Sequence, residues 1–142
     1  MGYPDPGTVV SVDFGIYHHP GIVTDRVMHG KPMVISNSCR RRGVYEESWD
    51  DFTCGRKVLV RRSPDPSQVA AILQRARSRV GWRWNLLRWN CEHFVAWSYG
   101  KSSHSPQLQS LIAGVALIAG TAMIYFRTTR KIPEQTSRAP SR

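Results

Sequence analysis

Residues 89–95, Trp-Asn-Cys-Glu-His-Phe-Val, decide how we interpret this chain. Asn90 is a good helix N-cap, and the residues three, four and seven positions after Cys91 form one face of a helix that Gly100 is placed to end. Cys91 would lie in the first turn, where free backbone N–H groups and the helix dipole favour an anion. A thiolate is such an anion. The pattern therefore predicts a cysteine with a lowered pKa, as a nucleophilic thiol requires.

The other cysteines give this thiol no covalent or metal-binding partner. The chain has 142 residues, enough for one domain, and three cysteines, Cys39, Cys54 and Cys91. Their number is odd and no C-x-x-C pair occurs, so we expect neither a disulfide framework nor a zinc site, and no cofactor. The N-terminus lacks the charged and apolar regions of a secretory signal. A free thiol in a reducing compartment fits these features best.

The chain is strongly basic, with a formal net charge of +10. Runs of arginine occur at 40–42 and 61–62, but no recognised nucleic-acid motif accompanies them, so we expect no nucleic-acid partner. Attraction to anionic lipid head groups is the better use of this charge.

The pattern of apolar residues predicts an α+β fold, with a small antiparallel sheet packed against helices. Apolar segments suited to strands occupy residues 8–14, 16–24, 33–37 and 57–61, and the second is interrupted at Pro20-Gly21. We expect residues 39–55 to form a polar, irregular loop. Asp65 and Pro66 begin a helix that Gly81 ends, and the cysteine helix follows after an aromatic, basic connection. These elements make up a catalytic domain over residues 1–101.

The composition changes after this domain. A polar linker over residues 102–107 leads into residues 108–126, which contain no charge. As a helix this segment would reach about 28 Å, close to the hydrocarbon thickness of a bilayer. We therefore expect one C-terminal transmembrane helix, followed by a basic, disordered tail over 127–142. The catalytic domain is expected in the cytoplasm because nothing upstream would export it, although the basic tail argues for a C-terminus inside.

A nucleophilic thiol needs a base within hydrogen-bond reach. His93 follows Cys91 by two residues and would point about 200° away on a helix, so a structural role is expected for it. His104 falls in the linker. His18 and His19 are adjacent on a strand and face opposite sides, and spacing alone does not choose between them.

The base in turn needs an orienting partner. The third predicted strand offers Ser36 and Asn37, whose side chains point to opposite faces of the sheet.

Two motifs resemble those of the lecithin retinol acyltransferase family. Residues 90–95, with Tyr99-Gly100, resemble the family's cysteine motif, and residues 17–23, Tyr-His-His-Pro-Gly-Ile-Val, resemble its histidine strand. The resemblance covers roughly residues 5–100. It implies a circularly permuted papain-like fold, in which histidine precedes cysteine, and it places the base at His19. The segment 108–126 resembles the C-terminal anchor of the phospholipase/acyltransferase branch.

The chain departs from the family at the third strand. Many members carry a second histidine after a Val-Ile-type pair, whereas Val34-Ile35 is followed here by Ser36 and Asn37. Asn37 is our first choice as the residue that orients His19, because related thiol enzymes use an amide in that role. Ser36 is the second choice and His29 the third.

The function expected from these residues is acyl transfer or ester hydrolysis through a thioester on Cys91. His19 would act as the base, and the backbone N–H of Cys91 would stabilise the oxyanion. The resemblance and the anchor together imply a phospholipid as acyl donor. A thiol peptidase or amidase on the same fold and a non-catalytic membrane adaptor are the two alternatives.

Overall fold

The computed structural model describes residues 2–101 and 106–129. The chain divides into two compact units, Met1–Leu108 and Gln109–Arg142, which we describe separately. The predicted linker at 102–107 and the predicted tail at 127–142 lie largely outside the described residues.

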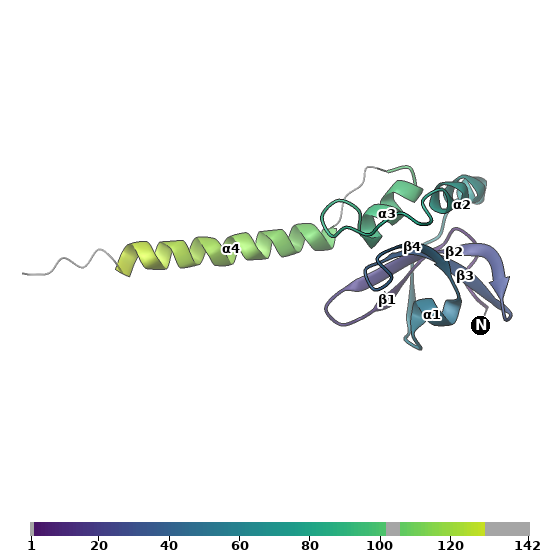
Figure 1. Ribbon diagram of the computed structural model, residues 1–142, viewed down its shortest axis with the longest axis horizontal. Coiled ribbons are helices and arrows are strands. Elements are labelled where there is room, and N and C mark those ends of the chain that lie inside the picture. Colours follow the sequence, from purple (N-terminus) through teal and green to yellow (C-terminus); the bar gives the residue numbers. More distant parts are fainter. Residues whose placement is uncertain (1, 102–105, 130–142) are drawn as a thin grey trace, which may run out of the picture. The chain divides into compact units, whose positions relative to one another are not determined.

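The first unit is built on a five-stranded antiparallel sheet in the order β4-β3-β2-β1-β5 (Figure 1). Its strands are β1 (Val9–Asp13), β2 (His18–Met28), β3 (Lys31–Ser38), β4 (Gly43–Glu47) and β5 (Val58–Arg62). All four predicted strands are present. The predicted interruption at Pro20-Gly21 is wrong, because both residues pair with β1 in an unbroken register, and β2 continues to Met28.

The segment predicted as an irregular loop, residues 39–55, contains β4 and a short helix, α1 (Trp49–Thr53). β4 pairs with β3 and buries Val44 completely. α1 begins where the Ser48 hydroxyl accepts a hydrogen bond from the backbone N–H of Asp51. The acidic residues suggested a solvated loop, but their partners are basic residues distant in sequence. Arg26 pairs with Glu46, for example, and Lys31 with Asp50.

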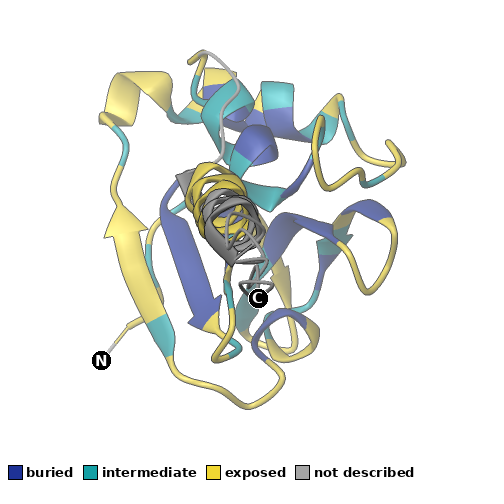
Figure 2. Cartoon of the chain, turned by 90° about the vertical axis from the view of Figure 1, so that its left-hand side faces the viewer, coloured by how far each residue is buried: buried dark blue, intermediate teal, exposed yellow. Residues whose placement is uncertain are grey.

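The helices cover both faces of the sheet. A 3₁₀ turn, η1 (Pro66–Gln68), leads into α2 (Val69–Arg77), which ends earlier than predicted, and α3 (Cys91–Ser98) matches the predicted cysteine helix. α2 and α3 lie on one face and α1 on the other (Figure 1). Figure 2 shows the buried residues gathered between these layers.

Strand alternation assigns the site residues to faces. Ile22 and Ile35 pack in the cluster that includes α2 and α3, whereas Val23 and Val34 pack with Phe52 of α1. Side chains two residues apart in a strand share a face. His19 and Ser36 therefore lie on the α1 face, and Asn37 lies on the α3 face.

Most of α4 (Pro106–Thr129), which includes the segment 108–126, belongs to the second unit. Within residues 2–101 and 106–129, no helix combines the length and apolarity needed to cross a membrane. The predicted transmembrane helix is not supported by this finding.

Gly21 sets the spacing between the strand that carries His19 and the α1 layer. A Cβ at this position would lie 2.6 Å from Cγ1 of Val34 and 2.7 Å from Cε2 of Phe52. Gly21→Ala should therefore destabilise the domain by about 1–3 kcal/mol, the usual range for overpacking a core. Urea unfolding measures this, with Gly2→Ala as the control because its Cβ would meet nothing within 4 Å. Equal midpoints for both variants would refute the close packing described here.

Candidate functional site

Asn90 fixes the start of the cysteine helix, as predicted. Its side-chain oxygen accepts hydrogen bonds from the backbone N–H groups of Glu92 and His93, each at 3.0 Å. In return, Nδ1 of His93 accepts the backbone N–H of Asn90 at 3.2 Å, which completes a capping box. The structural role expected for His93 is thus confirmed, with the imidazole as the acceptor.

The Cys91 thiol does not have the lowered pKa that its position predicted. Burial raises the pKa of Cys91 from 9.0 to about 12, and the carboxylate of Glu92 adds to the rise. Backbone N–H groups of Cys91 and Glu92 act in the opposite direction, but they do not outweigh the desolvation. Cys91 is therefore a neutral thiol at physiological pH.

His19 is buried, and its neighbour His18 is exposed. The His19 side chain packs against the rings of Phe52 and Phe14, with centroids 5.4 and 6.3 Å away. Burial, together with the positive charge of Arg40, lowers the pKa of His19 from 6.5 to about 4. His19 is therefore a neutral imidazole at physiological pH, with a lone pair available to accept a proton.

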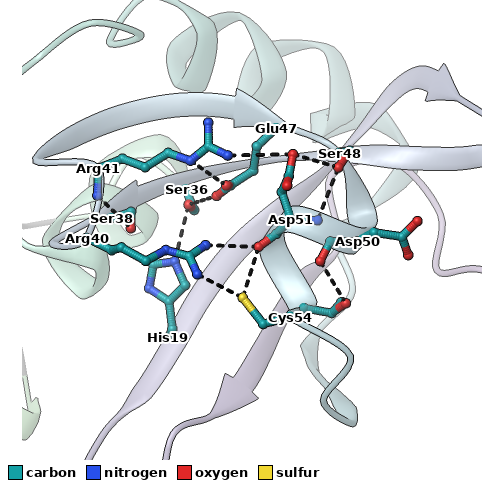
Figure 3. A network of polar contacts seen from close by, with 11 residues as sticks. His19, Ser36, Ser38, Arg40, Arg41, Glu47, Ser48, Asp50, Asp51 and Cys54 are labelled. Carbon is teal, nitrogen blue, oxygen red and sulfur yellow. Dashed lines mark hydrogen bonds and ion pairs between the residues drawn. The ribbon is translucent and has the colours of Figure 1, made fainter.

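A chain of polar contacts runs from His19 to the edge of the sheet (Figure 3). Nε2 of His19 lies 3.2 Å from Oγ of Ser36, and Ser36 donates to Oε1 of Glu47 at 2.7 Å. The Glu47 side chain is almost fully buried, and its second oxygen pairs with Nε of Arg41 at 3.2 Å. Arg41 also reaches the carboxylate of Asp51 at 3.5 Å.

This series of polar contacts determines which tautomer of His19 is present. A serine hydroxyl has one hydrogen, and that of Ser36 is given to Glu47, so Ser36 can only accept from His19. Nε2 of His19 must then carry the proton, and Nδ1 carries the lone pair. The ring nitrogen of His19 that is free to accept a proton is therefore Nδ1.

Asn37 does not make the hydrogen bond that we predicted for it. Its amide nitrogen donates to the backbone carbonyl of Trp89 at 2.7 Å, which ties β3 to the segment just before Cys91. The strand alternation that separates Ser36 from Asn37 was predicted, but the face that His19 occupies was not. The contact with His19 belongs to Ser36, our second choice. His29, the third, lies in the turn after β2 with φ of 53°.

Tyr17 and Cys39 both interact electrostatically with Cys91, and Tyr17 directly precedes the strand that carries His19. The Tyr17 hydroxyl lies 3.9 Å from Sγ of Cys39, and its ring stacks on Phe14, which also contacts His19. Burial and the negative charges that Cys39 and Cys91 would carry raise the pKa of Tyr17 to about 12. No hydrogen bond joins Cys91 to His19 among the described residues.

Sequence reasoning missed several of these side chains. It did not identify Tyr17, Arg41 or Glu47, whose roles depend on neighbours far along the chain. Within the described part of the chain, no group of three or more histidine, cysteine or acidic side chains could hold a metal ion.

Burial of neutral His19 predicts a specific dependence of stability on pH. Its pKa is about 4 in the folded state against an ordinary 6.5, so the unfolded chain binds the extra proton first as the pH falls. Stability should be fully present above pH 6.5 and decline by about 3 kcal/mol as the pH approaches 4. Chemical unfolding at several pH values should show this decline, and His19→Gln should remove it while His18→Gln retains it. The same decline in both variants would contradict the burial of His19.

Comparison with known proteins places the chain in a family. The family model described as lecithin retinol acyltransferase matches residues 3–103, which are most of the chain. A comparison with curated proteins finds no significant match. The matched residues contain both the capped Cys91 and the His19 strand, and members of this family are typically enzymes of the acyltransferase or phospholipase type. The chain belongs to the lecithin retinol acyltransferase family.

Proposed function

We propose that the protein transfers or hydrolyses the acyl group of a phospholipid ester through a thioester on Cys91, with His19 as the base. The observation that carries this proposal is the buried His19, held as the Nε2–H tautomer by Ser36 and Glu47. The family match supports it, and so does the capped start of α3. The order of histidine and cysteine agrees with a permuted papain-like arrangement, which we also propose.

The reaction follows from two neutral partners. Nδ1 of His19 takes the thiol proton of Cys91 while the sulfur attacks the ester carbonyl, and the imidazolium then protonates the leaving alkoxide as the acyl–oxygen bond breaks. Water or an acceptor alcohol or amine then loses its proton to His19 as it attacks the thioester. The carbon–sulfur bond breaks, and the imidazolium returns the proton to the sulfur, which releases the product and restores the free thiol and the neutral imidazole. The two residues must come into hydrogen-bond contact for this transfer, and catalytic hydrogen bonds often shorten only in the substrate complex.

Backbone N–H groups at the start of α3 suit the charge that develops on the ester oxygen. Those of Cys91 and Glu92 already act on the thiol, since they lower its pKa against the effect of burial. Donors fixed at a helix N-terminus need no rearrangement when the oxyanion forms.

Ser36 and Glu47 are assigned as positioning residues, in place of Asn37. The negative charge of Glu47 holds the Ser36 proton away from His19, and also stabilises the imidazolium that forms during the reaction. Arg41 balances this buried carboxylate.

We also propose that residues 108–126 keep the enzyme at a bilayer with its catalytic domain in the cytoplasm. The uncharged, apolar composition of this segment and the basic residues after it support that role.

The first test is detection of the acyl-enzyme. Incubation with phospholipid should add the mass of one acyl chain to the protein, and Cys91→Ala should abolish both this adduct and turnover without unfolding the domain. Cys39→Ala and Cys54→Ala are the matched controls and should retain both. An adduct that survives Cys91→Ala would remove the nucleophile from this proposal. An adduct with a peptide substrate but none with phospholipid would select the peptidase alternative.

The second test separates the positioning residues from their neighbours. Ser36→Ala and Glu47→Gln should each reduce kcat by about 10- to 100-fold, or about 1.4–2.7 kcal/mol, because the tautomer of His19 is no longer fixed. Ser38→Ala is the control, since Ser38 is a buried serine of the same strand whose hydroxyl accepts from the backbone N–H of Arg41 and makes no hydrogen bond to His19 within the described part of the chain. For Ser36→Ala we also expect a changed pH profile of kcat, which a purely structural defect would not produce. Equal rates in Ser36→Ala and Ser38→Ala would refute the assignment.

A further inference from the structure

The connection between α2 and α3 leads directly into the cysteine helix (Figure 1), and two aliphatic side chains in it are exposed to solvent. Within residues 82–89, which we call the docking loop, Leu87 is 64% exposed and Leu86 is 47% exposed. Trp82 in the same loop is 46% exposed. Single exposed apolar residues are ordinary, but two adjacent exposed leucines in one loop indicate a surface that contacts a partner.

The docking loop forms a turn that is held by its own hydrogen bonds. Asn85 and Trp89 exchange two backbone hydrogen bonds of 2.9 Å, and the Asn85 side chain accepts the N–H groups of Leu87 and Arg88. The Asn90 side chain also donates to the carbonyl of Leu86 at 3.1 Å. These bonds hold the backbone that presents both leucines, so their exposure is a consequence of the turn's own geometry.

The two ends of the docking loop, Trp82 and Trp89, are held in place by aromatic and cation–π contacts. The guanidinium of Arg79 lies 3.7 Å from the ring centroid of Trp82 and 4.2 Å from that of Trp97. Trp89 packs against Trp82, Phe94 and Trp97. Since α3 carries two of these rings, the loop is anchored to the helix that begins at Cys91.

The charge of the loop is uniformly positive. No acidic residue occurs between Asp65 and Glu92. Arg83 and Arg88 are exposed, and neither forms an ion pair with any residue that the structure describes.

A second exposed apolar pair, Val27 and Met28 at 68% and 42%, provides the contrast. The basic residues around that pair are neutralised, because Arg26 pairs with Glu46 and Lys31 with Asp50. The docking loop, in contrast, combines exposed aliphatic side chains with arginines that form no ion pair among the described residues, and it lies directly before Cys91.

We propose that the docking loop binds an anionic bilayer, with Leu86 and Leu87 entering the interfacial region and Arg83 and Arg88 contacting anionic head groups. Aliphatic side chains gain free energy on leaving water, and arginines gain from a negative surface. Nucleic acid fits less well, because leucine neither stacks on bases nor hydrogen-bonds to them, and the ring of Trp82, which could stack, already lies against the guanidinium of Arg79. Docking itself does not depend on the proposed chemistry, but under that function it delivers an ester to a thiol four residues beyond Leu87.

A fluorescent probe in the loop tests this in the full chain. The native cysteines are replaced, with Cys91→Ala so that no lipid is consumed, and an environment-sensitive dye is attached through Leu87→Cys or, as the control, through Val27→Cys. Vesicles of phosphatidylcholine and phosphatidylserine should shift the emission of the Leu87→Cys probe to the blue and leave the Val27→Cys probe unchanged. Adding Arg83→Gln and Arg88→Gln should raise the vesicle concentration for half the shift by about tenfold or more.

The outcome is independent of catalysis, since the chain tested lacks the nucleophile. Thermal unfolding confirms that each labelled chain is folded, and a second probe through Leu86→Cys repeats the measurement if the first chain is not. No shift at either leucine position, or an equal shift at Val27→Cys, would overturn the proposal that the docking loop binds a bilayer. A shift produced by single-stranded RNA and not by vesicles would replace the lipid with a nucleic acid and overturn it as well. A failure to form an acyl-enzyme would reject the proposed function and leave this result standing.

Discussion

The hydroxyl hydrogen of Ser36 is committed to the buried carboxylate of Glu47, and the rest of the site depends on this one bond. It leaves Ser36 only able to accept from His19, and so fixes the proton on Nε2. The bond joins neighbouring strands, since β3 carries Ser36 and β4 ends at Glu47. Arg41, in the turn between those strands, keeps the buried carboxylate paired. In the proposed mechanism, the sheet edge therefore serves the chemistry as well as the fold.

Desolvation, rather than the helix dipole, decides the charge state of Cys91, the proposed nucleophile. A helix N-terminus favours an anion by about 0.3–2 kcal/mol. The rise in the pKa of Cys91 from 9.0 to about 12 corresponds to about 4 kcal/mol in the opposite direction. Burial also keeps His19 neutral. Cys91 and His19 are then a thiol and an imidazole rather than an ion pair, and in the proposed reaction the charges appear only as it proceeds. The fixed groups that would meet those charges are the backbone N–H groups of α3 and the carboxylate of Glu47.

Much of this arrangement follows from local sequence patterns. The cap at Asn90, the helix that follows it and most of the strands could be predicted, because each depends on residues only a few positions apart. Alternation also separated Ser36 from Asn37. It could not tell which of them faces His19, because that depends on the pairing of Gly21 with Ser36 and on which face α1 covers.

What could not be predicted depends on partners far apart in the chain. The short strand and helix within 39–55 were missed because Glu46 and Asp50 pair with Arg26 and Lys31, some twenty residues earlier. The pKa of Cys91 was predicted in the wrong direction, since a pattern shows the position in a helix but not the depth of burial. The choice of His19 over His18 came from the family resemblance.

The tautomer and charge of His19 can be measured directly by NMR on the ¹⁵N-labelled protein, from the chemical shifts and couplings of its two ring nitrogens. Our account predicts a proton on Nε2 and a lone pair on Nδ1 at neutral pH, with protonation of the ring only near pH 4. A proton on Nδ1, or a titration near the ordinary pKa of 6.5, would contradict the central claim that Ser36 and Glu47 hold His19 as a buried, neutral base.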